Sequence, residues 1–440
     1  MRLGAVVLVA LSSFGWVDPS MGIDGGADGG RRDAGAQQAF ELTLRDADGG
    51  EPGWFAMAVE PATRRVGVAY FAPRGTETFA GSPDYDLKYL EWRAGVITPP
   101  QAVRVVQRPV GLSLAFQPGS GEPAIGLLGG VTDLMVSVFW FQHDAAVLTR
   151  AGTTWTETVV ARNSNDAICN DTFSDAPSGF LVGLWPALVY DGNGQMVLAW
   201  RDGHQTTNMS WYGSDVESAE GSLANPTLRC VNAGGPGGST GQKPAWGGRI
   251  QLTVGAGGQP AMVYDRAEGG ADTTGIQAWF QKRVGTGWTA PVQVLSSNDT
   301  KTGATLAWDP VEGYGVAVGD GASGGLTYRH SSDGVSWDTE DPVYGAGSGG
   351  WYPSLAFDPD SHQPHLAYYV CSARDGEVAS MCPASFDELR VAGRTASGWY
   401  ETTVDEAGGW LPKLGFFADG KRFVVYRDPR SGALKLAVER

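Results

Sequence analysis

This sequence contains a repeated pattern of short apolar runs, and charged side chains recur near the ends of several of these runs. The set comprises Arg201, Asp202, Asp265, Arg266, Asp320, Arg374, Asp375, Arg427 and Asp428. Arginine recognises carboxylates through two parallel hydrogen bonds, and aspartate can accept hydrogen bonds from sugar hydroxyls or bind a cation. These residues could therefore contact a ligand. They could equally tie neighbouring repeats together by charge-assisted hydrogen bonds, and both interpretations stay open.

Three of these aspartates, Asp202, Asp320 and Asp428, occupy the same position in their repeats. If that position faces a common axis, the carboxylates resist ionising together unless an arginine or a cation joins them. The tie interpretation predicts an arginine within about 4 Å of each aspartate, the usual reach of an ion pair. The ligand interpretation predicts that at least one of them faces an open pocket.

Two further residues extend the candidate set. His204 follows Arg201-Asp202 and could act as a base or a ligand, although a lone loop histidine is more often neither. Trp211 lies in the aromatic run Met209–Tyr212. Its face could stack on a sugar ring, or it could pack over a neighbouring repeat.

The motifs of the common cofactor enzymes do not occur in this sequence. It contains no P-loop, no dinucleotide-binding fingerprint in a βαβ unit and no G-x-S-x-G. The Asp-rich turn Asp358–Ser361 does not match the twelve-residue calcium loop. The sequence therefore predicts neither a cofactor nor a metal.

Four cysteines are present, and an even number in an exported chain suggests two disulfides. Cys371 and Cys382 are close in sequence and are the expected local pair, which leaves Cys169 with Cys230. A zinc site is the alternative, but no C-x-x-C and no histidine at metal-ligand spacing supports it.

One phrase occurs seven times: an apolar strand, a tight Asp/Gly/Pro turn and a second apolar strand. The copies begin at Phe55, Leu112, Pro186, Ile250, Thr305, Pro353 and Pro412. The same column of the first strand holds Met57, Leu114, Leu188, Leu252, Leu306, Leu355 and Leu414. Another apolar residue follows two positions later in each copy, which is the period of a strand rather than a helix.

A third strand follows each pair, and in most copies a fourth follows after a short turn ending in Trp. Four strands repeated seven times predict an all-β, seven-bladed β-propeller of four-stranded antiparallel blades. Six or eight blades, or a β-sandwich with an extra module, are the alternatives. The seventh copy ends after its third strand, Leu434–Val438, and a spare strand, Phe40–Arg45, precedes the first copy. We expect this spare strand to complete the last blade and close the ring.

The longest loops join second and third strands, as in 71–86, 201–215 and 370–387. Loops held by a rigid scaffold carry function disproportionately often. We therefore expect any binding site on the face that these loops share, near the axis of the ring.

The segment Ser331-Ser-Asp-Gly-Val-Ser-Trp337 resembles the Asp box, S-x-D-x-G-x-T-W, of sialidase-like repeats, shortened by one residue. Together with the seven copies, it makes residues 40–440 similar to a sialidase or BNR-type propeller. That resemblance implies a structural hairpin at the box. In an active enzyme it also implies an arginine triad, a Tyr nucleophile paired with Glu, and an Asp that acts as the acid. The arginine motif of that family is absent near the first repeat, where the nearest element is Phe71–Arg74, and no Tyr–Glu pair can be assigned.

The N-terminus and the charge balance indicate the compartment and the partners. Residues 1–22 resemble a secretory signal peptide, residues 23–39 form a Gly/Asp-rich spacer, and residues 40–440 form one domain. The formal net charge, 32 − 48 = −16, argues against a nucleic-acid partner. The apolar run near Met1 is too short to span a bilayer. We expect a secreted or cell-surface monomer that binds a glycan or a protein; the alternatives are a sialidase-like glycoside hydrolase or lyase, and a purely structural surface protein.

Overall fold

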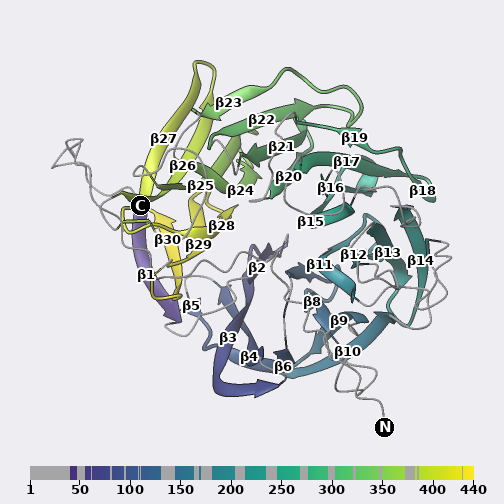
Figure 1. Ribbon diagram of the computed structural model, residues 1–440. Helices are drawn as coiled ribbons and strands as arrows, with labels where there is room; N and C mark the ends of the chain where they lie inside the picture. The colour runs from purple at the N-terminus through teal and green to yellow at the C-terminus, as the bar shows by residue number, and fades with distance from the viewer. Residues whose placement is uncertain are drawn as a thin grey trace, which may run out of the picture.

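In the computed structural model, seven antiparallel sheets stand in a ring around one axis (Figure 1). The structure describes residues 40–46, 55–60, 62–79, 82–93, 96–107, 109, 111–129, 144–162, 168–169, 181–203, 214–233, 245–267, 276–295, 303–320, 324–345, 349–371, 382–383, 386–428 and 430–440. The chain is all-β, and the predicted seven-bladed propeller is confirmed. Among the described residues, no helix has the length and apolar character needed to cross a membrane.

The blades follow the chain in order, each beginning with the strand nearest the axis. Blade 1 contains β2 (Phe55–Val59), β3 (Val66–Phe79), β4 (Ser82–Arg93), β5 (Val96–Ile97) and β6 (Gln101–Gln107); blade 2 contains β7 (Leu112–Phe116), β8 (Pro123–Gly129), β9 (Asp144–Ala151) and β10 (Thr154–Ala161). Blade 3 contains β11 (Leu181–Tyr190), β12 (Met196–Gly203), β13 (Asp215–Ser222) and β14 (Asn225–Asn232); blade 4 contains β15 (Ala245–Val254), the short 3-10 turn η2 (Ala256–Gly258), β16 (Pro260–Ala267), β17 (Ile276–Val284), β18 (Gly287–Trp288) and β19 (Val292–Gln293).

The remaining blades complete the circle. Blade 5 contains β20 (Ala304–Asp309), β21 (Gly313–Gly319), β22 (Leu326–Ser331) and β23 (Asp341–Tyr344); blade 6 contains β24 (Gly349–Phe357), β25 (Pro364–Cys371), β26 (Asp387–Thr395) and β27 (Gly398–Asp405). Blade 7 contains β28 (Trp410–Phe416), β29 (Arg422–Arg427), β30 (Leu434–Glu439) and β1 (Phe40–Asp46).

The outer strand is split in blades 1 and 4, whereas the sequence predicts one continuous fourth strand, ending at Leu295, in blade 4. In blade 1 it consists of β5 and β6, and in blade 4 of β18 and β19. Pro99 and Pro100 lie in the first break, and Pro291 lies in the second. Proline has no backbone N–H to donate to the neighbouring strand, so the pairing stops at these residues and resumes beyond them.

The ring closes as predicted. Strand β1 pairs antiparallel with β30, so the first strand of the chain is the outermost strand of the last blade (Figure 1). Phe40 is fully buried, and it packs among apolar residues of blades 6 and 7 such as Leu389 and Val424. The last blade therefore presents no unpaired edge along β30.

The inner strands are also tied to one another across three blade junctions. The side chains of Gln251, Thr305 and Ser354 accept hydrogen bonds from the backbone N–H of Leu306, Leu355 and Leu414 in the next blade, at 3.3, 3.0 and 3.0 Å. These acceptors precede the Leu column by one residue, so the strand period turns them toward the next blade. Lys413 holds the same position in blade 7, and burial lowers its pKa to about 8.

The Asp-box segment forms the hairpin that the resemblance implies. The Asp333 carboxylate accepts the backbone N–H of Val335 and of Ser336 at 2.8 and 2.9 Å. Ser331 Oγ donates to the carbonyl oxygen of Ser336 at 2.6 Å. Trp337 packs against Phe280 of blade 4, with ring centroids 5.1 Å apart. The segment is thus a structural device that joins two blades.

Both predicted disulfides are present. Cys371 and Cys382 are bonded with Cα atoms 5.8 Å apart, and Cys169 and Cys230 with Cα atoms 4.8 Å apart. The first pair packs against Trp351 and Tyr369 in blade 6.

Candidate functional site

The inner strands of four blades share an unusual backbone feature. Trp185, Arg249, Tyr352 and Leu411 have φ angles of 45°, 47°, 54° and 53°. All four precede the Leu column by three residues. A bulky residue with positive φ is strained by contact between its Cβ and the backbone, and such strain concentrates at functional sites. We refer to these four side chains as the inner-rim residues.

The local sequence explains the positive φ angles, which kink the inner strands. Gly183, Gly247 and Gly350 lie two residues before Trp185, Arg249 and Tyr352, and they also have positive φ. The pairing of β11, β15 and β24 with their second strands shifts register at these positions. Irregularities of this kind re-aim the side chains that follow them. The inner-rim residues therefore leave the alternating pattern that buries the Leu column.

The contacts of Arg249 are the best described of the four. Its Nη1 lies 2.9 Å from Oδ2 of Asp265, whose side chain is only 5% exposed while that of Arg249 is 32% exposed. A Cβ added to Gly303 of blade 5 would lie 3.1 Å from Cδ of Arg249. The arginine side chain thus passes directly over the start of the inner strand of blade 5, and glycine at 303 leaves room for it.

Tyr352 is the inner-rim residue of blade 6. Burial raises its pKa, and the positive charge of Arg249 partly opposes that rise. Arg249 belongs to blade 4, so two inner-rim side chains from separate repeats influence each other electrostatically.

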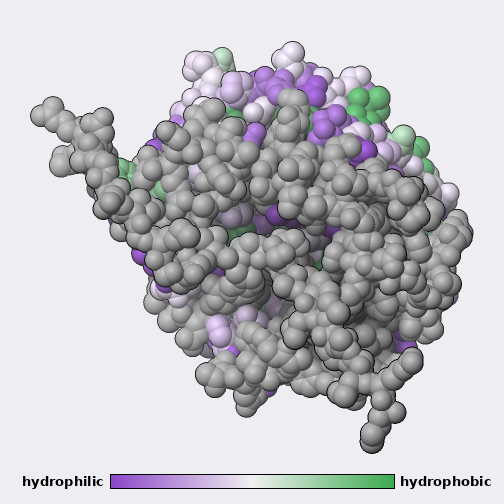
Figure 2. All heavy atoms as spheres, viewed as in Figure 1, coloured by the Kyte–Doolittle hydropathy of each residue, from purple (hydrophilic) through white to green (hydrophobic). Residues whose placement is uncertain are grey.

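Trp185 adds an aromatic face beside a buried cation. The guanidinium of Arg201 lies over its indole ring, 5.3 Å from the centroid. Arg266 makes the corresponding contact with Trp279 inside blade 4, at 5.1 Å. Figure 2 shows the same side of the ring as Figure 1, hollowed at its centre, where hydrophilic and hydrophobic residues are both visible.

For Asp428, a member of the predicted column of aspartates, the structure describes an ion pair and two hydrogen bonds from turn amides. Asp428 pairs with Lys435 at 2.7 Å, a lysine rather than a predicted arginine. Burial alone would raise the pKa of Asp428, but Lys435 and two turn amides lower it to about 2. Arg427 donates to the carbonyl oxygen of Gly432 at 3.2 Å. These charges are held inside blade 7.

The other candidates are distributed over several environments. Asp202 is fully buried on β12, directly opposite Asp215 on β13. The carbonyl oxygen of Asp320 accepts a hydrogen bond from the indole of Trp351 at 3.0 Å, which ties blade 5 to blade 6. Four candidates, His204, Trp211, Arg374 and Asp375, lie outside the described residues.

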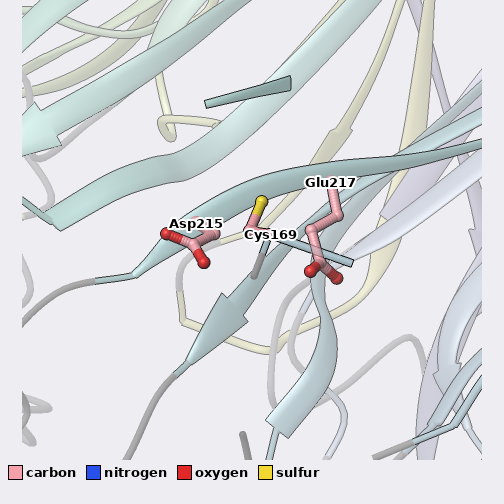
Figure 3. A group of neighbouring side chains, drawn as sticks. All are labelled: Cys169, Asp215 and Glu217. Carbon is pink, nitrogen blue, oxygen red and sulfur yellow. The ribbon is translucent and has the colours of Figure 1, made fainter. Parts of the chain in front are cut away.

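A cluster of potential metal ligands lies in blade 3. Ligand atoms of Cys169, Asp215 and Glu217 lie within 4.8 Å of one another, and all three residues are buried (Figure 3). The sulfur of Cys169 is bonded to Cys230 and is not a thiolate. Glu217 accepts a hydrogen bond from the indole of Trp200 at 3.0 Å. The donor set is thus two carboxylates beside a disulfide, fewer oxygens than the six to eight that calcium takes.

One buried carboxyl group has a raised pKa. Burial raises the pKa of Asp387, at the start of β26, to about 6, against the opposing charge of Arg430 at 2.8 Å. The Asp387 side chain is about 1% exposed.

The sequence contained a signal for the inner-rim residues that the strand pattern obscured. Gly183-Leu-Trp-Pro186, Gly350-Trp-Tyr-Pro353 and Gly409-Trp-Leu-Pro412 repeat glycine three residues before proline, with a large side chain directly before the proline. Alternation of apolar residues alone does not mark these positions, because tryptophan, tyrosine and leucine also suit a buried strand.

Comparison with known proteins adds the fold and no family assignment. No family model matches the chain, and no curated protein matches it. A solved fungal alcohol oxidase of the AA5 family, in complex with copper, is 12% identical, with 91% of this chain and 76% of that chain covered and a TM-score of 0.51. The fold is shared.

Two glycosidase-type structures are also similar. The α-L-arabinofuranosidase Arb93A from Fusarium graminearum is 9% identical, with coverage of 92% and 96% and a TM-score of 0.48. The intramolecular trans-sialidase from Ruminococcus gnavus is 12% identical, with coverage of 91% and 97% and a TM-score of 0.44. Sialidases are thus among the similar structures.

Proposed function

We propose that this propeller binds a glycan at the inner rim, with Trp185, Arg249 and Tyr352 as its contacts. The observation that carries the proposal is that Trp185, Arg249 and Tyr352 occupy equivalent strained positions on the inner strands of blades 3, 4 and 6. Backbone strain at equivalent positions in four blades lowers stability. Side chains directed toward a ligand give such strain a function.

The chemistry of the inner rim suits a sugar. Arg249 and Asp265 place donors and an acceptor side by side, 2.9 Å apart. Trp185 and Tyr352 add aromatic rings, which pack on the C–H face of a sugar while polar groups bind its hydroxyls. A ligand site of this kind, a few polar groups among aromatic ones, is the usual form of a small-molecule site.

Binding has more support than hydrolysis in the described residues. A tyrosine nucleophile needs a neighbouring base or a lowered pKa, whereas burial raises the pKa of Tyr352. The carboxyl group with a raised pKa, Asp387, is about 1% exposed and paired with Arg430. These two observations favour binding over glycoside cleavage, which uses two carboxyl groups flanking the bond.

The compartment and the oligomeric state form part of the same proposal. Disulfides persist in oxidising compartments, and the two disulfides of this chain therefore support export to the cell surface or the medium. We expect the exported protein to be a monomer. Light scattering on the purified protein tests this expectation, and mass spectrometry of the secreted chain shows where residues 1–39 are cut.

The test is a glycan array followed by calorimetric titration of the best glycan. Arg249→Met and Trp185→Leu keep much of the apolar bulk and should each weaken binding at least tenfold. Arg93→Met removes an arginine that is 64% exposed on blade 1 and should bind as the wild type does. Wild-type affinity in the first two variants, or no binding on the array, would overturn the proposal. Release of a shortened glycan would replace binding with hydrolysis.

A further inference from the structure

A groove lies between blades 6 and 7 on the face opposite the inner-rim residues. It has a volume of about 400 Å³. The hairpin turns that join first to second strands and third to fourth strands border it, and they include Asp358, Arg394 and Gly420. We call it the short-turn groove. Because the inner-rim residues lie at the other ends of β24 and β28, the groove is a separate site.

An ion pair forms one wall of the short-turn groove. Arg422 Nε lies 3.0 Å from Oε2 of Glu439, and a second hydrogen bond joins Arg422 Nη2 to Oε1. The backbone N–H of Arg422 also donates to Glu439, at 3.1 Å. Arg422 Nη1 then contacts Tyr400 Oη at 3.3 Å. The arginine side chain is only 10% exposed, so this wall is preorganised rather than mobile.

His365 supplies a neutral polar group in the same groove. Burial, together with the charge of Arg422, lowers the pKa of His365 to about 4. Its Nδ1 lies 3.5 Å from Nη1 of Arg422, which favours the tautomer with the proton on Nε2. The ring packs edge-on against Phe416 at 5.3 Å. The groove thus combines aromatic walls with an imidazole that carries no charge at neutral pH.

Glycine at 393 makes this arrangement possible. A Cβ at Gly393 would lie 2.5 Å from Oη of Tyr400 and 2.7 Å from Cε1 of His365. Glycine inside a strand usually marks a point where another group approaches closely. Here the approaching groups are two side chains that line the groove, so the backbone of β26 accommodates the groove directly.

The charges of the groove balance. Its carboxylates are Asp358 and Glu439, and its guanidinium groups are Arg394 and Arg422. Arg394 also pairs with Asp341 on the outer strand of blade 5, at 3.2 Å. An anion site needs excess positive charge and a cation site needs excess negative charge. A balanced set of donors and acceptors instead matches a neutral ligand that has many hydroxyl groups.

Tyr400 is exposed where the repeats do not require it. In the described part of the chain, Tyr400 is one of the large apolar residues that are exposed, at 40%. In blades 2 and 4, the residue after the hairpin tryptophan is Thr156 or Thr289, and in blade 6 it is Tyr400. The hairpin therefore forms without a tyrosine. An exposed ring beside a polar groove is a platform on which a sugar can stack.

We propose that the short-turn groove binds a neutral saccharide, with Tyr400 as the stacking platform and Arg422, Glu439 and His365 as hydrogen-bonding partners. This second site stands on contacts that do not involve the inner rim. A propeller with ligand sites on both faces could hold two glycans at once, or two parts of one branched glycan.

Saturation-transfer NMR with glucose, galactose, mannose, arabinose, cellobiose and lactose tests the proposal on the full-length chain. We expect transfer from the wild type to at least one of these sugars. Tyr400→Thr copies blades 2 and 4 and should reduce transfer at least fivefold without unfolding the chain. Gly393→Ala should reduce it through displacement of Tyr400 and His365. Val335→Thr, which changes a side chain 61% exposed on blade 5, should leave transfer unchanged.

The inner-rim variant Arg249→Met separates the two proposals. This variant should still transfer saturation to the neutral sugars, whatever its effect on the glycan bound at the inner rim. Loss of transfer in Arg249→Met with retention in Tyr400→Thr would overturn the second site and leave the first. Absence of saturation transfer to every neutral sugar, or stronger transfer to glucuronate, would show that the charge-balance reasoning is wrong.

Discussion

Two buried groups at opposite ends of blade 6 should make the stability of this protein respond to pH in opposite directions. The pKa of His365 is about 4, below its unfolded value near 6.5. The pKa of Asp387 is about 6, above its unfolded value near 3.8. As the pH falls below 6.5, the unfolded chain protonates His365 first, so the folded state loses stability. As the pH falls through 6, the folded state protonates Asp387 first, so it gains stability.

The two effects have opposite signs and similar full magnitudes, so they partly cancel. Taken over its full range, each pKa difference corresponds to on the order of 3 kcal/mol. Both side chains are at least nine-tenths buried, so solvent screening reduces these values little. Between pH 7 and pH 5, His365 should cost the folded state about 2 kcal/mol and Asp387 should return about 1 kcal/mol. The wild type should therefore show a shallow profile over this interval.

Single substitutions should reveal the two opposing contributions. Asp387→Asn leaves His365 alone, so its stability relative to the wild type should fall by about 1 kcal/mol between pH 7 and pH 5. His365→Phe keeps the ring contacts and leaves Asp387 alone, so its relative stability should rise by about 2 kcal/mol over the same interval. Comparison with the wild type cancels the contributions of the other carboxylates.

The assay is equilibrium unfolding in guanidinium chloride at pH 5, 6 and 7, followed by tryptophan fluorescence. Asp360→Asn changes an exposed turn carboxylate on the same blade and serves as the control. If the three variants and the wild type give parallel profiles, the burial of His365 and Asp387 does not control their protonation, and the reasoning is refuted.

Four further outcomes can be measured on the same protein. Arg249→Gly should change stability by less than about 1 kcal/mol in urea titrations while glycan binding is lost, because relief of a strained φ offsets a partly exposed ion pair; a large loss of stability would count against this. Thr305→Val should cost about 1–3 kcal/mol, because it leaves the buried N–H of Leu355 without an acceptor, and an unchanged unfolding midpoint would contradict that tie. Removal of residues 1–46 should lower the melting temperature far more than removal of residues 1–38, since only the first deletes β1; equal melting temperatures would argue against closure. Cys371→Ser should cost about 2–3 kcal/mol relative to the oxidised wild type through loss of a short cross-link, and equal unfolding midpoints of the two proteins would contradict this.

The sequence by itself determined the architecture. Seven copies of an alternating strand pair predict seven blades, because side chains alternate across a sheet and each blade must bury both faces. The missing strand of the last copy and the spare strand before the first predict the closure that β1 and β30 make. Local spacing also sufficed for both disulfides and for the hairpin at Ser331–Trp337, since these depend on residues near one another or on elimination.

Only the tertiary structure decided which polar residues meet. Asp428 pairs with Lys435, where the tie interpretation predicts an arginine, because β29 and β30 are adjacent in the sheet. Arg249 reaches the start of blade 5 because its backbone is kinked and because blade 5 has glycine at 303. The short-turn groove needs Tyr400 from one blade and Arg422 from the next. A repeat pattern specifies the neighbours of a residue within its own strand, whereas backbone kinks and the packing of blades set the direction of each side chain and the partners it reaches.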